Sequence, residues 1–90
     1  MKKQADRQAI FQSQFLDDLA YWVRTDRKVA LHVLELVSAV IRDPFAGVGK
    51  PELLKFGLTG CWSRRITQEH RMVYRVIGTQ VNFLQARYHY

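Results

Sequence analysis

The chain has 90 residues, of which 48% are hydrophobic, so it has room for one domain with a small core. Its single cysteine, Cys61, excludes an intramolecular disulfide framework and indicates a reducing compartment. The sequence offers neither an apolar run long enough to cross a bilayer nor the hydrophobic segment of a secretory signal. We therefore expect a cytoplasmic protein that folds as a single domain over residues 1–90.

The N-terminal half predicts a short strand followed by a helical hairpin. Residues 1–7 are expected to form a flexible extension, and residues 9–12 are a candidate edge strand. Ser13 is expected to cap a first helix, whose apolar residues recur at three- and four-residue spacing. Thr25-Asp26 offers the cap of a second helix. Asp43-Pro44 ends that helix, because proline disfavours helical geometry in the residue before it.

After the second helix the pattern changes from helical to loop and strand. Glycines and prolines indicate a loop over residues 44–52. Three strands follow at residues 61–67, 71–77 and 81–88, separated by short turns as in a meander. The order of one strand, two helices and several strands predicts an α+β fold, in which a two-helix hairpin packs on one face of a mostly antiparallel C-terminal sheet.

The positive charge is concentrated in the second half of the chain. The net charge is +6. Residues 1–48 contain seven Lys and Arg against six Asp and Glu, whereas residues 49–90 contain seven against two. A basic half of this kind is typical of a protein that binds a polyanion, although a solubilising surface would carry the same charge.

Side-chain alternation along the strands predicts which basic residues share a face of the sheet. It places Arg64 on the helix side, and in the last strand it also assigns Leu84, Ala86 and Tyr88 to the helix side. Four basic residues would then meet on the uncovered face: Arg65, Arg71, Arg87 and His89. Polar residues are ordinary on the wet face of an antiparallel sheet, but clustered cations with few acidic partners favour a site for an anion.

Glu52 lies in the predicted loop, close in sequence to Lys50 and Lys55. A glutamate near two lysines is usually a surface ion pair of small energetic consequence. Cleavage of RNA by its own 2′-hydroxyl, however, needs a base for that hydroxyl, positive charge for the phosphorane and an acid for the leaving 5′-oxygen. Glu52, the cationic residues and His89 would supply these three roles if the loop folds over the basic face.

Four spaced motifs carry a resemblance to a known family. They are Lys50-Pro51-Glu52, residues 60–66 (GCWSRRI), residues 69–74 (EHRMVY) and residues 87–90 (RYHY). Together they resemble the YoeB/Txe toxins of the RelE superfamily, which belong to bacterial type II toxin–antitoxin systems. The resemblance extends from about Phe11 to Tyr90. It implies the RelE-like microbial ribonuclease fold.

The resemblance also implies an activity and a set of partners. The protein would be a ribosome-dependent endoribonuclease that cleaves mRNA in the A site of the 70S ribosome by acid–base catalysis, without a metal or other cofactor, and so arrests translation. A cognate YefM-like antitoxin with an acidic, partly disordered C-terminal segment would inhibit it. The toxin would contact DNA only indirectly, through that antitoxin. No membrane partner is expected, and a homodimer is possible.

Carried onto the matching positions, the resemblance implies roles for eight residues. In the catalytic group, Glu52 would be the general base, His89 the general acid, Arg71 the main phosphate-stabilising residue, and Tyr90 would shape the site beside His89. The RNA- and phosphate-binding group would be Lys50, Lys55, Arg65 and Arg87. Two other hypotheses use the same basic face: a module that binds RNA or the ribosome without chemistry, and an interaction protein whose basic face seats only an acidic partner.

Overall fold

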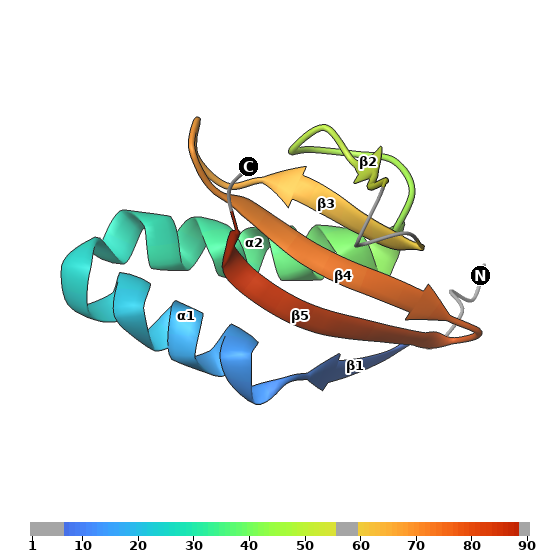
Figure 1. The fold of residues 1–90 in the computed structure, drawn as a ribbon, viewed down its shortest axis with the longest axis horizontal. Coiled ribbons are helices and arrows are strands. Elements are labelled where there is room, and N and C mark those ends of the chain that lie inside the picture. The colour runs from blue at the N-terminus through green and yellow to red at the C-terminus, as the bar shows by residue number, and fades with distance from the viewer. Residues whose placement is uncertain (1–6, 56–59, 89–90) are drawn as a thin grey trace, which may run out of the picture.

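A computed structural model of the chain describes residues 7–55 and 60–88. Its elements follow in the order β1 (Gln8–Phe11), α1 (Ser13–Thr25), α2 (Arg27–Arg42), β2 (Glu52–Leu53), β3 (Cys61–Arg65), β4 (Arg71–Ile77) and β5 (Gln80–Tyr88). The two helices lie together on one side of the sheet (Figure 1). This arrangement confirms the predicted α+β fold with an N-terminal strand, a helical hairpin and a C-terminal sheet.

The strands form one five-stranded sheet in the order β1-β5-β4-β3-β2. The pairs β2–β3, β3–β4 and β4–β5 are antiparallel, which confirms the predicted meander. β1 pairs with β5 in parallel, from Gln8 opposite Gln80 to Phe11 opposite Phe83. The first strand therefore lies beside the last one and forms one edge of the sheet, and β2 forms the other edge (Figure 1).

The helix boundaries follow capping chemistry at two of the three predicted positions. The Asp26 side chain caps α2 by accepting a hydrogen bond from the Val29 N–H at 3.4 Å, and α2 ends at Arg42, before Pro44. The prediction for Ser13 is wrong. The capping position of α1 belongs to Gln12, whose side chain makes no capping bond within the described part of the chain, and Ser13 is already helical.

Replacing Asp26 by alanine is expected to lower the free energy of unfolding by about 1 kcal/mol, because the first turn of α2 loses its side-chain acceptor. Urea denaturation would measure the loss. Ser13→Ala is the matched control, and its effect should stay within about 0.5 kcal/mol because Ser13 does not occupy the capping position. Equal losses in the two variants would contradict this assignment.

Arg7 connects the start of the described chain to the end of α2. Its Nη1 donates hydrogen bonds to the carbonyl oxygens of Ile41 at 2.7 Å and Arg42 at 3.0 Å. These oxygens belong to the last turn of a helix, where carbonyl groups have no intrahelical partner and a cation is favourable. Residues 1–6 of the predicted flexible extension lie outside the described residues.

The main core fills the space between the helical hairpin and the sheet. It is built chiefly by Phe15, Trp22, Val33, Leu36 and Val40 from the helices and by Met72, Tyr74, Val81, Phe83 and Ala86 from the strands. Because side chains alternate along a strand, the opposite face of the sheet carries a second, smaller cluster. It consists of Leu54, Cys61 and Val73, with Leu84 and Tyr88 packed against it.

This second cluster shows that the prediction for the last strand is partly wrong. Ala86 faces the helices as expected, but Leu84 and Tyr88 lie on the opposite face. Two register shifts interrupt the pairing of β4 with β5. An extra residue in one strand moves the following side chains to the other face, so strict alternation fails beyond it.

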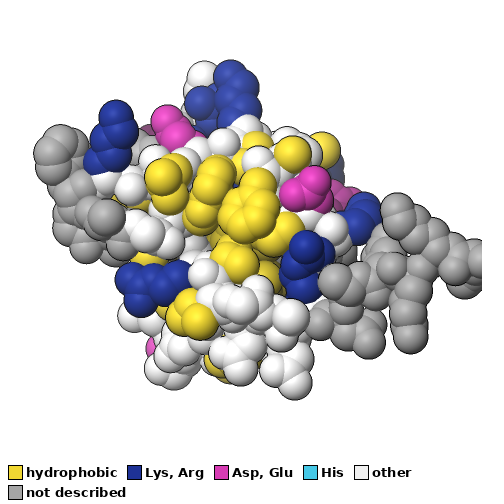
Figure 2. All heavy atoms as spheres, turned by 90° about the vertical axis from the view of Figure 1, so that its right-hand side faces the viewer, with side chains coloured by type: hydrophobic (Ala, Val, Ile, Leu, Met, Phe, Trp, Pro, Cys, Tyr) yellow, Lys and Arg dark blue, Asp and Glu magenta, His cyan; other side chains and the backbone are white. Residues whose placement is uncertain are grey.

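One end of the molecule exposes hydrophobic side chains that neither core encloses. Figure 2 shows them in the middle of this end, with Lys and Arg side chains around them. Phe45, which follows α2, is 52% exposed, and its ring packs 5.2 Å from that of Trp62. Ile77, at the end of β4, is also exposed.

Candidate active site

Arg71 is the centre of the candidate site. It begins β4, and its side chain is only 11% exposed. Its Nε donates to the Ser63 Oγ at 2.7 Å, and its Nη2 donates to the Lys50 carbonyl oxygen at 3.2 Å. The same Nη2 lies 3.2 Å from Glu52 Oε1. Contacts on two sides of the guanidinium hold its plane in one orientation, which a flexible surface arginine would lack.

Glu52 reaches Arg71 through the pairing of β2 with β3. Glu52 lies opposite Ser63, and Ser63 in turn lies opposite Val73 on β4. The Glu52 side chain remains 60% exposed. An ion pair with one partner this open to solvent is screened by water and contributes little to stability. A carboxylate that is open to solvent and adjacent to a fixed cation can accept a proton from a bound ligand.

Arg64 organises the loop that precedes β2. It is fully buried on the helix side, as alternation predicts, and its guanidinium donates to the carbonyl oxygens of Asp43, Ala46 at 3.0 Å and Val48 at 3.1 Å. Its Nε donates to the Tyr74 hydroxyl at 3.2 Å. A buried guanidinium with carbonyl acceptors replaces lost hydration and fixes the loop around it.

The Tyr74 hydroxyl continues the Arg64 network. It donates to the Pro44 carbonyl oxygen at 2.6 Å, while accepting from Arg64. Burial raises the pKa of Tyr74 above its ordinary value of 10.0, and the neighbouring Arg64 opposes that rise. The hydroxyl therefore stays protonated and keeps donating to the loop. Sequence reasoning assigned Arg64 and Tyr74 no such role; the available signal was an arginine on an otherwise apolar strand face, near a glycine-rich loop.

Two left-handed backbone positions then direct the loop toward Arg71. Gly49 has φ +87°, and a Cβ atom there would lie 3.0 Å from Leu36 Cδ2. Its carbonyl oxygen accepts the Arg65 N–H at 2.6 Å, which ties the loop to the end of β3. Lys50 follows with φ 53°, a conformation that non-glycine residues rarely adopt. This sharp turn carries the Lys50 carbonyl oxygen to Arg71.

Three of the four predicted phosphate-binding residues lie near Arg71, and the fourth, Arg87, does not. Arg65 is exposed and lies directly opposite Arg71 in the β3–β4 pairing. Like charges in that arrangement repel one another, so an anion between them would be stabilising. Lys50 and Lys55 are exposed on either side of β2. The chain therefore brings Glu52, Arg71 and Arg65 together, with lysines beside them.

Arg87 does not join this group, and the prediction that it shares a face with Arg71 is wrong. Its guanidinium carbon lies 3.6 Å from the centre of the Tyr21 ring, so it stacks against α1 on the helix side. The physical reason is the register shift that precedes Tyr88 in the pairing of β5. His89 and Tyr90 lie outside the described residues, directly after Tyr88, which is itself opposite Arg71.

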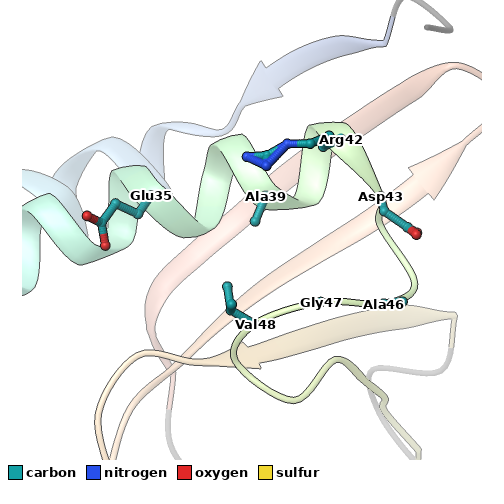
Figure 3. A pocket seen from close by; sticks show the side chains of 7 residues that line it. All are labelled: Glu35, Ala39, Arg42, Asp43, Ala46, Gly47 and Val48. Atoms are coloured by element: carbon teal, nitrogen blue, oxygen red, sulfur yellow. The ribbon is translucent and has the colours of Figure 1, made fainter.

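A separate pocket lies where the loop crosses the end of α2. It has a volume of about 540 Å³ and is lined by Glu35, Ala39, Arg42, Asp43, Ala46, Gly47 and Val48. Ala39 and Val48 point toward one another across it (Figure 3). Its lining comes from α2 and the first half of the loop, so it is distinct from the Glu52–Arg71 site.

The described residues contain neither a metal-binding cluster nor a membrane-spanning helix. Within residues 7–55 and 60–88, no three His, Cys, Asp or Glu side chains gather closely enough to hold a metal ion. Neither helix of the described part is long and apolar enough to cross a membrane.

Comparison with known proteins identifies the family. Residues 11–90 match the family described as YoeB-like toxin of bacterial type II toxin–antitoxin system. Toxin YoeB of Streptomyces coelicolor is 49% identical over 80 residues, which are 89% of this chain and 95% of that protein. The YoeB dimer from Staphylococcus aureus has a TM-score of 0.85 at 38% identity, and covers 96% of this chain and 100% of its own.

A second solved structure shows a relative with its partner. The heterotetrameric YoeB–YefM toxin–antitoxin complex from Staphylococcus aureus matches with a TM-score of 0.81 and 38% identity, over 96% of this chain and 100% of that one. Both the family match and the near-complete coverage of these relatives extend across the elements that build the Glu52–Arg71 site. The chain therefore belongs to the YoeB-like toxins of bacterial type II toxin–antitoxin systems.

Proposed function

We propose that this toxin is a ribosome-dependent endoribonuclease that cleaves mRNA in the A site of the 70S ribosome and thereby arrests translation. The observation that carries the proposal is the contact between Glu52 and Arg71 on the open face of the sheet, at 3.2 Å, in a chain of the YoeB-like family. A solvent-open carboxylate beside an oriented guanidinium combines a base with a phosphate-binding group in one place.

In the proposed reaction, the Glu52 carboxylate takes the proton of a ribose 2′-hydroxyl. The 2′-oxygen attacks the adjacent phosphorus, and Arg71 and Arg65 stabilise the additional negative charge of the phosphorane. The bond from phosphorus to the 5′-oxygen then breaks, and His89 donates the proton that this oxygen needs. Tyr90 would shape the site next to His89. The step leaves a 2′,3′-cyclic phosphate on one fragment and a 5′-hydroxyl on the other, and requires neither metal nor cofactor.

The remaining cations would hold the RNA backbone. Lys50 and Lys55 are exposed near Glu52, so phosphates on either side of the cleaved bond are within their range. Arg87 remains a predicted phosphate contact. Because its guanidinium stacks on Tyr21, it could bind only phosphates of RNA that lies along α1.

The proposed protein partners follow from the relatives. Solved YoeB–YefM complexes support binding of a YefM-like antitoxin by this toxin, and a solved YoeB dimer supports a homodimer. An acidic, partly disordered antitoxin segment would be attracted by the basic half of the chain and order on binding. Contact with DNA would be indirect, through the antitoxin, and the toxin would act in the cytoplasm.

Primer extension on mRNA bound to programmed ribosomes tests the proposal. The purified toxin should produce discrete cuts within the A-site codon, and His89→Gln should reduce them by about 100-fold because the leaving oxygen loses its acid. Ribosome binding should be retained in that variant. The competing hypothesis of a non-catalytic RNA- or ribosome-binding module requires the opposite result: wild-type protein that is folded and bound to ribosomes but produces no cuts.

A further inference from the structure

Ser63 places a buried hydroxyl on the open face of the sheet. It is 0% exposed, and its neighbours on that face include Cys61, two residues earlier on β3, and Val73, directly opposite on β4. Both neighbours belong to the second hydrophobic cluster. A buried hydroxyl in such surroundings is costly unless it is hydrogen-bonded, and an apolar β-branched residue would suit the strand better. Packing alone therefore does not account for a serine at this position.

The hydrogen bond of this hydroxyl is made with Arg71. The Arg71 Nε donates to the Ser63 Oγ at 2.7 Å, although the two residues are not opposite one another in the β3–β4 pairing. Arg71 lies opposite Arg65, and Ser63 lies opposite Val73. The arginine side chain therefore reaches diagonally across the strand pair, and its bond to Ser63 restrains that direction.

The second acceptor of the same guanidinium is a backbone carbonyl group that β3 also holds in place. The Arg71 Nη2 donates to the Lys50 carbonyl oxygen at 3.2 Å. The two residues that follow Ser63 bind the loop that carries this carbonyl group. The buried Arg64 guanidinium binds loop carbonyl oxygens, and the Arg65 N–H donates at 2.6 Å to the carbonyl oxygen just before Lys50. Three consecutive residues of β3 thus support these two acceptors.

Both acceptors are uncharged, which matters for a group that binds a phosphate. A hydroxyl and a carbonyl group orient a guanidinium without cancelling its charge, whereas a carboxylate in their place would pair with it through two bonds and compete with an anionic ligand. The Nε of Arg71 has one hydrogen, and Ser63 accepts it. The Glu52 carboxylate, whose Oε1 lies 3.2 Å from Nη2, therefore cannot also occupy Nε.

We propose that Ser63 is a positioning residue for the reaction, because its hydroxyl holds the Arg71 guanidinium in the plane in which it binds the phosphorane. Two acceptors at different nitrogens fix that plane, whereas with one acceptor the plane can turn about the remaining bond. Stabilisation of a developing charge depends on donors that are oriented before the reaction. Ser63 is fully buried, so it acts through Arg71 and does not touch RNA. This inference rests on the proposed function for the role of Arg71.

Single-turnover cleavage by Ser63→Ala on programmed ribosomes tests this role. The change removes the acceptor without adding bulk. The cleavage rate should fall about 10- to 100-fold because Arg71 is no longer oriented, whereas ribosome affinity should be unchanged because no charge is lost. The matched control is Cys61→Ala, which also alters a buried side chain on the same face of β3, opposite Arg75. It should cleave at nearly the wild-type rate.

The same substitution in an Arg71→Lys background separates positioning from a general effect on the fold. Lysine has no planar group to orient, so adding Ser63→Ala to Arg71→Lys should lower the rate further by less than about 3-fold. A structural effect of the missing hydroxyl would lower the rate by the same factor in both backgrounds. Such equal losses, or a wild-type rate in Ser63→Ala, would overturn the proposal.

A readout that needs no RNA keeps this inference separate from the proposed function. The NMR signal of the Arg71 Nε–H is identified by its loss in Arg71→Lys, and its exchange with water reports on the bond to Ser63. Exchange should be about 10-fold faster in Ser63→Ala and unchanged in Cys61→Ala. Unchanged exchange in Ser63→Ala would refute the positioning role. Absence of cleavage by wild-type toxin would instead refute the proposed function, and the exchange measurement would still decide whether Ser63 orients Arg71.

Discussion

Replacing Arg71 by lysine is expected to lower the rate of mRNA cleavage on programmed ribosomes by about 100- to 1,000-fold. Lysine keeps the charge, but a single ammonium cannot bond Ser63 and Lys50 and also present the flat, two-pronged donor edge that suits a phosphorane. Single-turnover primer extension would measure the rate. Ribosome affinity, measured by co-sedimentation, should change little because the positive charge is retained.

The control is Arg75→Lys, the same substitution on the same strand and the same face. Arg75 is exposed, and its Nη2 lies 3.4 Å from the Cys61 sulfur, four residues along β4 from Arg71. It should cleave at nearly the wild-type rate. If Arg71→Lys retained full activity, or if Arg75→Lys lost as much, Arg71 would not be the centre of the site.

Replacing Arg64 by leucine is expected to lower the free energy of unfolding by about 3 to 5 kcal/mol. Three loop carbonyl oxygens and the Tyr74 hydroxyl lose a donor in a buried place, where water cannot fully replace it. A small domain is stable by only about 5 to 15 kcal/mol, so much of the stability would be lost. Urea denaturation followed by tryptophan fluorescence would measure the change.

Arg65, the next residue, provides the control for the stability loss expected at Arg64. Arg65→Leu alters an exposed side chain and should change the free energy of unfolding by no more than about 0.5 kcal/mol. It should, however, weaken RNA binding and make that binding less dependent on salt, because one phosphate contact is removed. The opposite pattern, with a stability loss at Arg65 and none at Arg64, would contradict the placement of the two arginines on opposite faces.

Much of the fold could be predicted because the deciding signals are local. Apolar spacing located the two helices, Asp26 and Pro44 set the ends of α2, and short polar turns, one of them with Gly78, separated the last three strands. The helix-side placement of Arg64 also followed from alternation. The meeting of Glu52 with Arg71 was a conditional expectation, since it depended on where the loop would lie.

The remainder depends on contacts between distant residues. The Ala86 backbone in the β5 bulge is hydrogen-bonded by Asp18 and Trp22, which are 68 and 64 residues away in the sequence. No local sequence pattern around Ala86 predicts this bulge. For the same reason the position of Arg87 on Tyr21 was missed. The parallel pairing of β1 with β5 is equally non-local. The roles of His89 and Tyr90 came from family resemblance and stay predictions, because both residues lie outside the described part of the chain.

The position of β5 between β1 and β4 has a consequence for how the toxin folds during its synthesis. During synthesis, β1 and the helical hairpin emerge first, but the strand that joins β1 to the rest of the sheet is among the last segments to leave the ribosome. Contacts of such long range form late in folding. A nascent chain therefore lacks the complete five-stranded sheet until its last strand has left the ribosome.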